Sequence, residues 1–191
     1  MILPIYAYGS PVLRKKAREI ERDYPELTAL IDNMFETMYR SHGVGLAAPQ
    51  VGKSIRLFIV DTSGFAEMDG LTEQERQEVI AFKKVFINAY ITEEKGEVWS
   101  FNEGCLSIPD IHEDVKRPTT ITIRYVDENF KEHTDVYEGI MARVIQHEYD
   151  HLEGILFTDR LSPLKKRLLK RKLESIKKGK ITVNYPMRFV K

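Results

Sequence analysis

The sequence predicts an α+β fold, in which mostly antiparallel strands pack around one central helix and further helices lie toward both ends of the chain. Two observations support this class. Apolar residues recur at spacings of three and four over residues 25–42, 139–151 and 163–180, whereas alternating and β-branched segments dominate the middle. These predicted strands mostly follow one another without helices between them, which is typical of α+β folds and not of parallel α/β sheets.

The first predicted helix spans residues 25–42. Pro25 suits a first helical turn, and Gly43 suits the position just past the end. We expect a glycine-punctuated loop over residues 43–50 and then a strand over residues 55–60.

Short strands are expected to fill the middle of the chain, after an acidic excursion over residues 63–84 that includes one short helical stretch. Residues 85–91 are rich in β-branched side chains, and residues 97–101 alternate and are expected to pair with them. Residues 119–126 alternate as well. We expect them to form a hairpin with residues 130–137.

The chain of 191 residues suits a single domain, residues 1–191, with a basic helix over residues 163–180 and an extended tail over residues 181–191. The numbers of basic and acidic residues are equal, so the net charge is near zero. We therefore expect no direct DNA binding and no nucleic-acid-binding surface that covers the whole protein. The charge is unevenly spread, however. Residues 165–180 carry a net charge of +8, which leaves −8 on the rest of the chain.

Cysteine usage and the N-terminus predict a cytoplasmic protein. The single cysteine, Cys105, cannot form an internal disulfide, so the usual sign of an oxidising compartment is missing. The first residues have neither the basic region nor the long apolar core of a secretory signal. No run of 18 apolar residues occurs, so we expect no membrane association.

The segment HEYDH, residues 147–151, lies on the helix predicted over residues 139–151. A helix turns once in about 3.6 residues, so His147 and His151 share a face. Two imidazoles at this spacing can ligate one metal ion, and Glu148 between them can reach a water on it. Two surface histidines would give the same pattern. The apolar run before the motif predicts burial instead, and buried histidines and acids need a partner such as a divalent cation.

A catalytic metal usually has three protein ligands and one open position. Cys105 is the candidate for the third ligand, because Gly104 beside it lets the backbone come close to another group. Buried packing is the more common role of a lone cysteine and stays an alternative. Glu153 lies too close to the motif to turn back. Three other histidines lie far off in the sequence and have no supporting motif: His42, His112 and His133.

The loop over residues 43–50 reads GVGLAAPQ. A helix C-cap followed by a turn explains Gly43, but it does not explain Gly45 or the small apolar residues that lead to Gln50. Small residues permit close packing beside a site. Gln50 would offer an amide donor in apolar surroundings, which suits stabilisation of a developing oxyanion.

Three segments together resemble the signature motifs of the peptide deformylase family. They are GVGLAAPQ (residues 43–50), EGCLS (103–107) and QHEYDHLEG (146–154), and their order and separation match the family as well. The resemblance covers residues 4–161 and is weaker over residues 63–84 and in the C-terminal tail. It implies an α+β fold built on a central, metal-binding helix of the HExxH type.

The resemblance implies a hydrolase that removes the N-formyl group from the N-terminal methionine of newly synthesised proteins and releases formate. It implies that Cys105, His147 and His151 hold one ferrous ion, which zinc, nickel or cobalt can replace. Glu148 would be the general acid and base. A thiolate ligand makes iron(II) easy to oxidise, so we expect an oxygen-sensitive iron form and a sturdier nickel or zinc form.

The resemblance also implies how the substrate is held. Gln50 and the backbone N–H of Leu106 would bind the formyl oxygen, and the carbonyl of Gly45 would accept from the substrate backbone. Any one wall residue of the methionine pocket could instead be plain core. We expect Arg143 to lay its methylenes along the pocket and send its guanidinium outward. The implied pocket walls are Val44, Phe101, Ile108, Ile140, Val144 and the stem of Arg143, with Glu103 at the rim.

The expected partners are N-formylmethionyl peptides and nascent chains. The basic helix over residues 163–180 could face ribosomal RNA, or it could be an ordinary solvated face. Two other functions fit part of the pattern. An HExxH zinc peptidase would leave Cys105 and residues 43–50 without a role. A non-catalytic module of the same fold would lack a ligand or the base, and none is missing.

Overall fold

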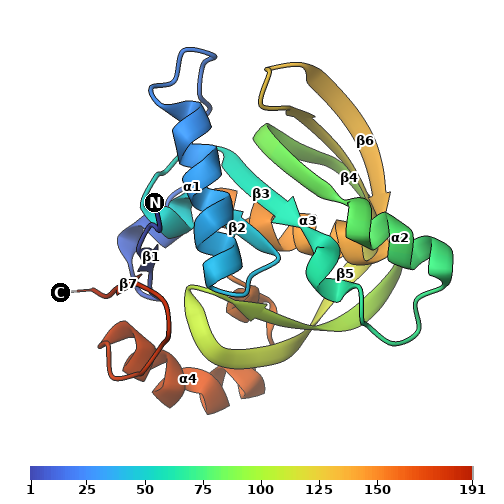
Figure 1. Cartoon of the computed structure of the whole chain (residues 1–191). Coiled ribbons are helices and arrows are strands. Elements are labelled where there is room, and N and C mark those ends of the chain that lie inside the picture. The colour runs from blue at the N-terminus through green and yellow to red at the C-terminus, as the bar shows by residue number, and fades with distance from the viewer. Residues whose placement is uncertain (191) are drawn as a thin grey trace.

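A computed structural model describes residues 1–190 and confirms the α+β class (Figure 1). The main sheet has five strands in the order β2–β3–β4–β5–β6, and every neighbouring pair is antiparallel. Four α-helices accompany it within residues 1–190. The strands of this sheet are β2 Gly45–Ala47, β3 Leu57–Asp61, β4 Lys83–Cys105, β5 Ile108–Val126 and β6 Glu132–Glu138.

Three of the four helices match those expected from apolar periodicity: α1 Leu27–Arg40, α3 Gly139–Leu152 and α4 Pro163–Lys177. At the start of α4 the Ser162 side chain accepts from the backbone N–H of Lys165, as an N-cap should. The fourth, α2 Glu73–Ala81, lies in the acidic excursion and is longer than the short stretch expected there.

Strand β3 lies between two helices and is buried on both sides. Its residues alternate between two hydrophobic clusters: Leu57 and Ile59 pack with residues of α1, whereas Phe58 and Val60 pack with residues of α3. Figure 1 shows α1 in front of β2 and β3, and α3 behind them. This arrangement presses α3 against the strand that carries Gly45.

The expected pairing of residues 85–91 with residues 97–101 is wrong. Both segments belong to the single long strand β4, and both pair with β5: Ile91 lies opposite Ile123, and Phe101 opposite Val115. The polar stretch between them looks like a turn in the sequence. It continues the ladder because bulges on either side absorb extra residues.

The hairpin expected after residue 119 is confirmed. β5 and β6 pair from Thr120 opposite Glu138 to Val126 opposite Glu132. Ile121, Ile123 and Tyr125 are buried on one face, as their alternation predicts. The chain then enters α3 directly at Gly139.

The C-terminal tail, which was expected to be extended, contributes a short strand to a second, two-stranded sheet. Met187–Arg188 forms strand β7, which pairs in parallel with β1, Ile5–Tyr6, near the start of the chain. Figure 1 shows this small sheet beside both termini. Lys191, the last residue of the expected tail, lies outside the described residues. Within residues 1–190, no helix has the length and apolar character needed to cross a membrane.

Candidate active site

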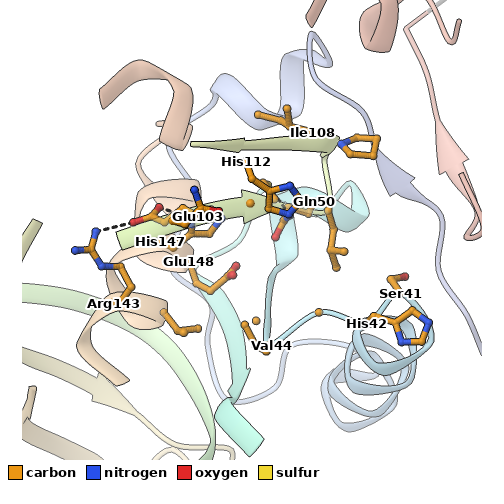
Figure 2. Close-up of a pocket in the computed structure, with 18 of the residues that line it drawn as sticks. Ser41, His42, Val44, Gln50, Glu103, Ile108, His112, Arg143, His147 and Glu148 are labelled. Carbon is orange, nitrogen blue, oxygen red and sulfur yellow. Dashed lines mark hydrogen bonds and ion pairs between the residues drawn. The ribbon is translucent and has the colours of Figure 1, made fainter. Parts of the chain in front are cut away.

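A cavity of about 420 Å³ lies where the end of α1, strand β2, the β4–β5 turn and α3 meet. Figure 2 shows the Glu148 carboxylate pointing into it, with Arg143 on one side and Ser41 and His42 on the other. All three segments of the deformylase resemblance reach this cavity, although they are far apart in the sequence.

Three potential metal ligands meet beside the cavity, and two of them, Cys105 and His147, line it. The ligand atoms of Cys105, His147 and His151 all lie within 4.8 Å of one another, and Cys105 Sγ is 3.4 Å from His151 Nε2. Both histidines are one turn apart on α3, as their spacing predicts. One sulfur and two imidazole nitrogens form a donor set that suits a borderline-soft divalent cation.

The charges of this cluster also suit a cation. Burial lowers the pKa of His151 well below its usual value, which favours the neutral imidazole that binds metals. Burial has the same tendency at His147, but hydrogen bonds to Cys105 and Glu103 outweigh it and raise the pKa of His147. A proton on His147 and a bound cation are therefore alternative ways to balance the same negative groups.

Glu103 holds His147 in place from behind. Its carboxylate lies 3.0 Å from His147 Nδ1, so that nitrogen carries the proton and Nε2 is free to face the ligand cluster. Burial alone would raise the pKa of Glu103, but hydrogen bonds from Arg117 and His147 hold it well below its usual range. Glu103 is 5% exposed, so the expectation that it sits at the pocket rim is wrong.

The expectation that the Arg143 guanidinium points to solvent is also wrong. Arg143 is only 1% exposed, and its Nη1 donates to Glu103 at 2.8 Å and to the Val115 carbonyl at 3.0 Å (Figure 2). The side chain turns inward, where the guanidinium pairs with the buried carboxylate of Glu103. A buried charge is costly unless it is paired and hydrogen-bonded, and this pairing satisfies both groups. Both residues line the cavity.

Arg117 is a structural element of the site that the sequence did not reveal. Its guanidinium donates to Glu103 at 2.7 Å and to Asp150 at 2.8 Å, and it is 1% exposed. Asp150 also binds Arg160. Asp150, the second acid of the HEYDH segment, therefore has arginine partners and is not a partner of the metal cluster. Arg117 stands in an alternating strand, where an outward charge is the ordinary expectation.

Glu148 is the remaining acid of the motif, and unlike Asp150 it makes no salt bridge with an arginine within residues 1–190. It is 4% exposed, and its Oε2 has no hydrogen-bond partner within residues 1–190. Burial raises the pKa of the Glu148 carboxyl to about 7, which suits a group that both accepts and returns a proton near neutral pH. An unpaired buried carboxylate oxygen is costly, and water on a neighbouring cation would satisfy it.

Gln50 lies on a short 3₁₀ helix, Ala48–Val51, with its amide held in one orientation. The backbone N–H of Ala47 donates to its Oε1 at 2.8 Å. Its Nε2 therefore points toward the β4–β5 turn, 3.5 Å from Cys105 Sγ and 3.3 Å from Ser107 Oγ. The amide is thus a donor directed toward Cys105 of the ligand cluster.

The β4–β5 turn itself consists of Leu106 and Ser107, between the paired residues Cys105 and Ile108. Leu106 lines the cavity and Ser107 is fully buried. The turn thus presents the Leu106 backbone immediately beside the potential ligand Cys105.

Most of the predicted pocket walls reach the cavity: Val44, Phe101, Ile108 and Val144 all line it. Ile140 is buried but is not among the lining residues. Two histidines judged remote from their sequence positions, His42 and His112, do line the cavity, although neither belongs to the ligand cluster. His42 follows the end of α1, and His112 lies opposite Gly104 across the β4–β5 pairing.

Comparison with known proteins identifies the family. The family model for polypeptide deformylase matches residues 2–167. The chain belongs to the polypeptide deformylase family. It is 61% identical to the peptide deformylase of Christiangramia forsetii over 99% of this chain and 96% of that protein. It is 57% identical to the Flavobacterium johnsoniae peptide deformylase over the same shares.

Solved deformylase structures share the fold as well. The crystal structure of the Legionella pneumophila peptide deformylase matches with a TM-score of 0.79 at 37% identity, covering 94% of this chain and 98% of that one. The family predicted from three sequence motifs is confirmed. The chain is therefore a metal-dependent hydrolase that removes N-formyl groups from N-formylmethionyl peptides, and Cys105, His147 and His151 form a cluster of potential metal ligands in it.

Proposed function

We propose that this deformylase binds one divalent cation through Cys105 Sγ and the imidazoles of His147 and His151. The grouping of these three donors beside the substrate-sized cavity carries the proposal. Three protein ligands leave a coordination position open for chemistry. Two buried polar atoms, Glu148 Oε2 and His151 Nδ1, have no hydrogen-bond partner within residues 1–190. Such atoms are normally satisfied, which supports a site that also holds non-protein polar groups, such as water on a cation.

The cation we propose is Fe²⁺, with zinc, nickel or cobalt able to replace it. A mixed sulfur and nitrogen donor set favours these metals over magnesium or calcium, which prefer oxygen. When bound, such a cation lowers the pKa of a coordinated water and polarises a carbonyl. Metal analysis of protein purified without oxygen identifies the ion.

Glu148 is the proposed general base and general acid. Its raised pKa lets it take a proton from the attacking water and later give that proton to the departing amine of the peptide. The carboxylate lies inside the cavity, one residue from His147, so both transfers take place beside the ligand cluster.

Gln50 and the backbone N–H of Leu106 are the proposed donors to the formyl oxygen. Negative charge gathers on that oxygen when the formyl carbon becomes tetrahedral. A fixed donor stabilises this charge without reorganising during the reaction. The Gln50 amide is fixed by its bond from Ala47, and Leu106 is held in a two-residue turn.

The substrate peptide is proposed to run along the free edge of β2. Asp61 donates from its backbone N–H to the Val44 carbonyl, so Gly45 and Val60 form the next, non-hydrogen-bonded pair. The N–H and C=O of Gly45 therefore point away from β3. Because β2 is an edge strand, these groups can bind an extended peptide.

The formyl-bearing methionine is proposed to enter the apolar part of the cavity. Val44, Phe101 and Val144 supply apolar surface there, with Ile108 on the opposite strand. The Phe101 ring makes a T-shaped contact with Phe65, which also lines the cavity and comes from the segment after β3. An unbranched, flexible thioether suits such an irregular apolar space.

The cellular setting we propose is the cytoplasm, with residues 1–191 acting as one catalytic domain. Nascent chains are the source of N-formylmethionyl substrates. We further propose that α4 contacts the ribosome, because its exposed side is strongly basic while the rest of the chain is acidic. The resulting charge attraction would bring the enzyme to its substrate.

Formate release from formyl-Met-Ala-Ser by the metal-loaded protein tests the function, with the unformylated peptide as the rival substrate. Glu148→Gln should keep its metal and lower turnover by a factor of about 10² to 10⁴. Glu153→Gln is the matched control, because that acid pairs with Arg56 and Lys16 away from the cavity. Cleavage of the unformylated peptide, or full turnover in Glu148→Gln, would refute the proposal.

A further inference from the structure

We propose that Tyr185, in the C-terminal tail, is a positioning residue that holds the β4–β5 turn, Leu106 and Ser107, in its working geometry beside Cys105. The inference rests on the proposed function, in which Leu106 supplies a donor to the formyl oxygen. It adds a segment that the family model does not reach, because that model ends at residue 167.

The contact is a direct hydrogen bond from the tail to the turn. The Tyr185 hydroxyl donates to the Leu106 carbonyl at a distance of 2.8 Å. The ring is partly buried against the hydrophobic cluster of α1, and it lines the same cavity as Leu106 and Cys105. Tyr185 is therefore both anchored and adjacent to the reacting region.

The opposite side of the turn is held by other groups. The backbone N–H of Tyr8 donates to the Ser107 carbonyl at 2.8 Å, and Gln50 Nε2 lies 3.3 Å from Ser107 Oγ. Tyr185 supplies the bond to the Leu106 carbonyl. Without it, the two bonds named above would act on Ser107 only, and the Leu106 carbonyl would lose its side-chain donor.

The tail is attached firmly enough to serve as a support. Along β7, the backbone N–H of Ile5 donates to the Pro186 carbonyl and that of Ala7 to the Arg188 carbonyl, each at 2.9 Å. Met187 and Phe189 pack on a third hydrophobic cluster, which includes Leu169 and Leu173 of α4. Tyr185 is two residues from Met187, so β1 and the core fix its position.

The consequence for the reaction follows from which groups the turn carries. Cys105 and Leu106 share one peptide unit, so a rotation of the turn moves the proposed oxyanion donor relative to the proposed sulfur ligand. Donors to an oxyanion act through their placement, and small displacements weaken them in the transition state more than in the bound substrate. Loss of the Tyr185 hydroxyl should therefore lower kcat more than it raises KM.

Tyr185→Phe tests this in the zinc-loaded protein, because it removes the hydroxyl and keeps the ring. We expect kcat for formyl-Met-Ala-Ser to fall about fivefold with KM nearly unchanged, the factor for loss of one ordinary hydrogen bond. The ¹³C resonance of the Leu106 carbonyl should shift as its hydrogen bond is lost. Zinc content should stay at one per chain.

Tyr6→Phe is the matched control. It also removes a tyrosine hydroxyl, the acceptor for Arg188 in the same attachment of the tail, but it does not touch the turn. Equal kcat in the two variants, or an unshifted Leu106 carbonyl resonance in Tyr185→Phe, would overturn the inference. A wild-type protein that releases no formate would contradict the proposed function instead, which separates the two failures.

Discussion

Glu148 lies against the backbone of β2 at Gly45. A Cβ atom built on Gly45 would lie 2.5 Å from Glu148 Oε1 and 2.8 Å from its Cδ and Cγ. Real atoms of this kind do not approach so closely, so a side chain here requires the carboxylate to move. The lack of a side chain at Gly45 thus leaves room for the carboxylate of Glu148, about 100 residues away in the sequence.

Gly45→Ala should therefore lower activity without releasing the metal. Displacing the Glu148 carboxylate by about 1 Å is enough to cost roughly a hundredfold in turnover, because a general base must lie within hydrogen-bond reach of its proton. Formate release and metal content per chain measure the two effects. Gly70→Ala controls for a general loss of stability: its φ of 85° makes an alanine strain the backbone, but nothing lies within 4 Å of a Cβ there, so no active-site group is displaced. Activity retained in Gly45→Ala would contradict the steric account.

His147, Glu148 and His151 could be predicted from the sequence because helical geometry brings them together locally, whereas Cys105 was predicted from the glycine beside it and from the resemblance to a family motif. His42 and His112 could not be predicted, because their approach to the cavity depends on long-range pairing. His112 reaches Gly104 only through an irregularity between Gly104 and Cys105, where three extra residues of β5 are absorbed. The left-handed φ of 60° at Asp110 lies in that irregularity, and no local pattern predicts it.

At the scale of elements, apolar alternation alone could not predict that β4 is one continuous strand. The residues between Thr92 and Val98 are exposed, so they carry no periodic signal. Gly96, with a φ of 85°, stands among them and looks like a turn residue. In the structure the stretch is held by β5 alone: Glu94 pairs with Ile121, and Lys95 pairs with Thr120. Segments with one buried face, such as α3 and residues 119–126 of β5, were predictable.

The same elements are joined by buried charge. Glu103 is on β4, Arg117 on β5 and Asp150 on α3, and the arginine bonds both acids. Burial would lower the pKa of Arg117, but its two carboxylate partners raise it above the usual value, so it stays charged. The buried guanidinium of Arg117, placed between two buried acids, therefore links the helix that carries His147 to the hairpin that carries Cys105.

Arg117→Met should destabilise the protein by about 3–5 kcal/mol, because it leaves two buried carboxylates short of a partner. The thermal midpoint should fall by about 10 °C for a protein of this size. Differential scanning calorimetry of the metal-free and zinc-loaded forms measures the change. Lys116→Met, an exposed neighbour on the same strand, should leave the midpoint almost unchanged. Equal midpoints for the two variants would show that the buried charge does not hold the elements together.

At the scale of the whole molecule, charge is divided between α4 and the rest of the chain. The helix buries Leu169, Leu173 and Ile176, which pack on the cluster that includes Ile108. This apolar face attaches it to the strand leaving the active-site turn. Its lysines and arginines lie on the remaining surface, exposed to solvent apart from Lys165, which pairs with Glu113 at 2.7 Å.

Reversing three exposed charges of α4 tests whether this surface binds the ribosome. In the variant with Lys166, Lys170 and Lys172 changed to Glu, co-sedimentation with ribosomes should weaken while formate release from a free tripeptide stays at the wild-type rate. Phosphate contacts make affinity fall with salt, and each lost contact should reduce that slope by about 0.7–0.9. Changing Lys15, Lys53 and Lys131 to Glu alters the net charge equally at exposed positions elsewhere. If both variants bind ribosomes as the wild type does, α4 is a solvated face without this role, and if both weaken equally, net charge alone is responsible.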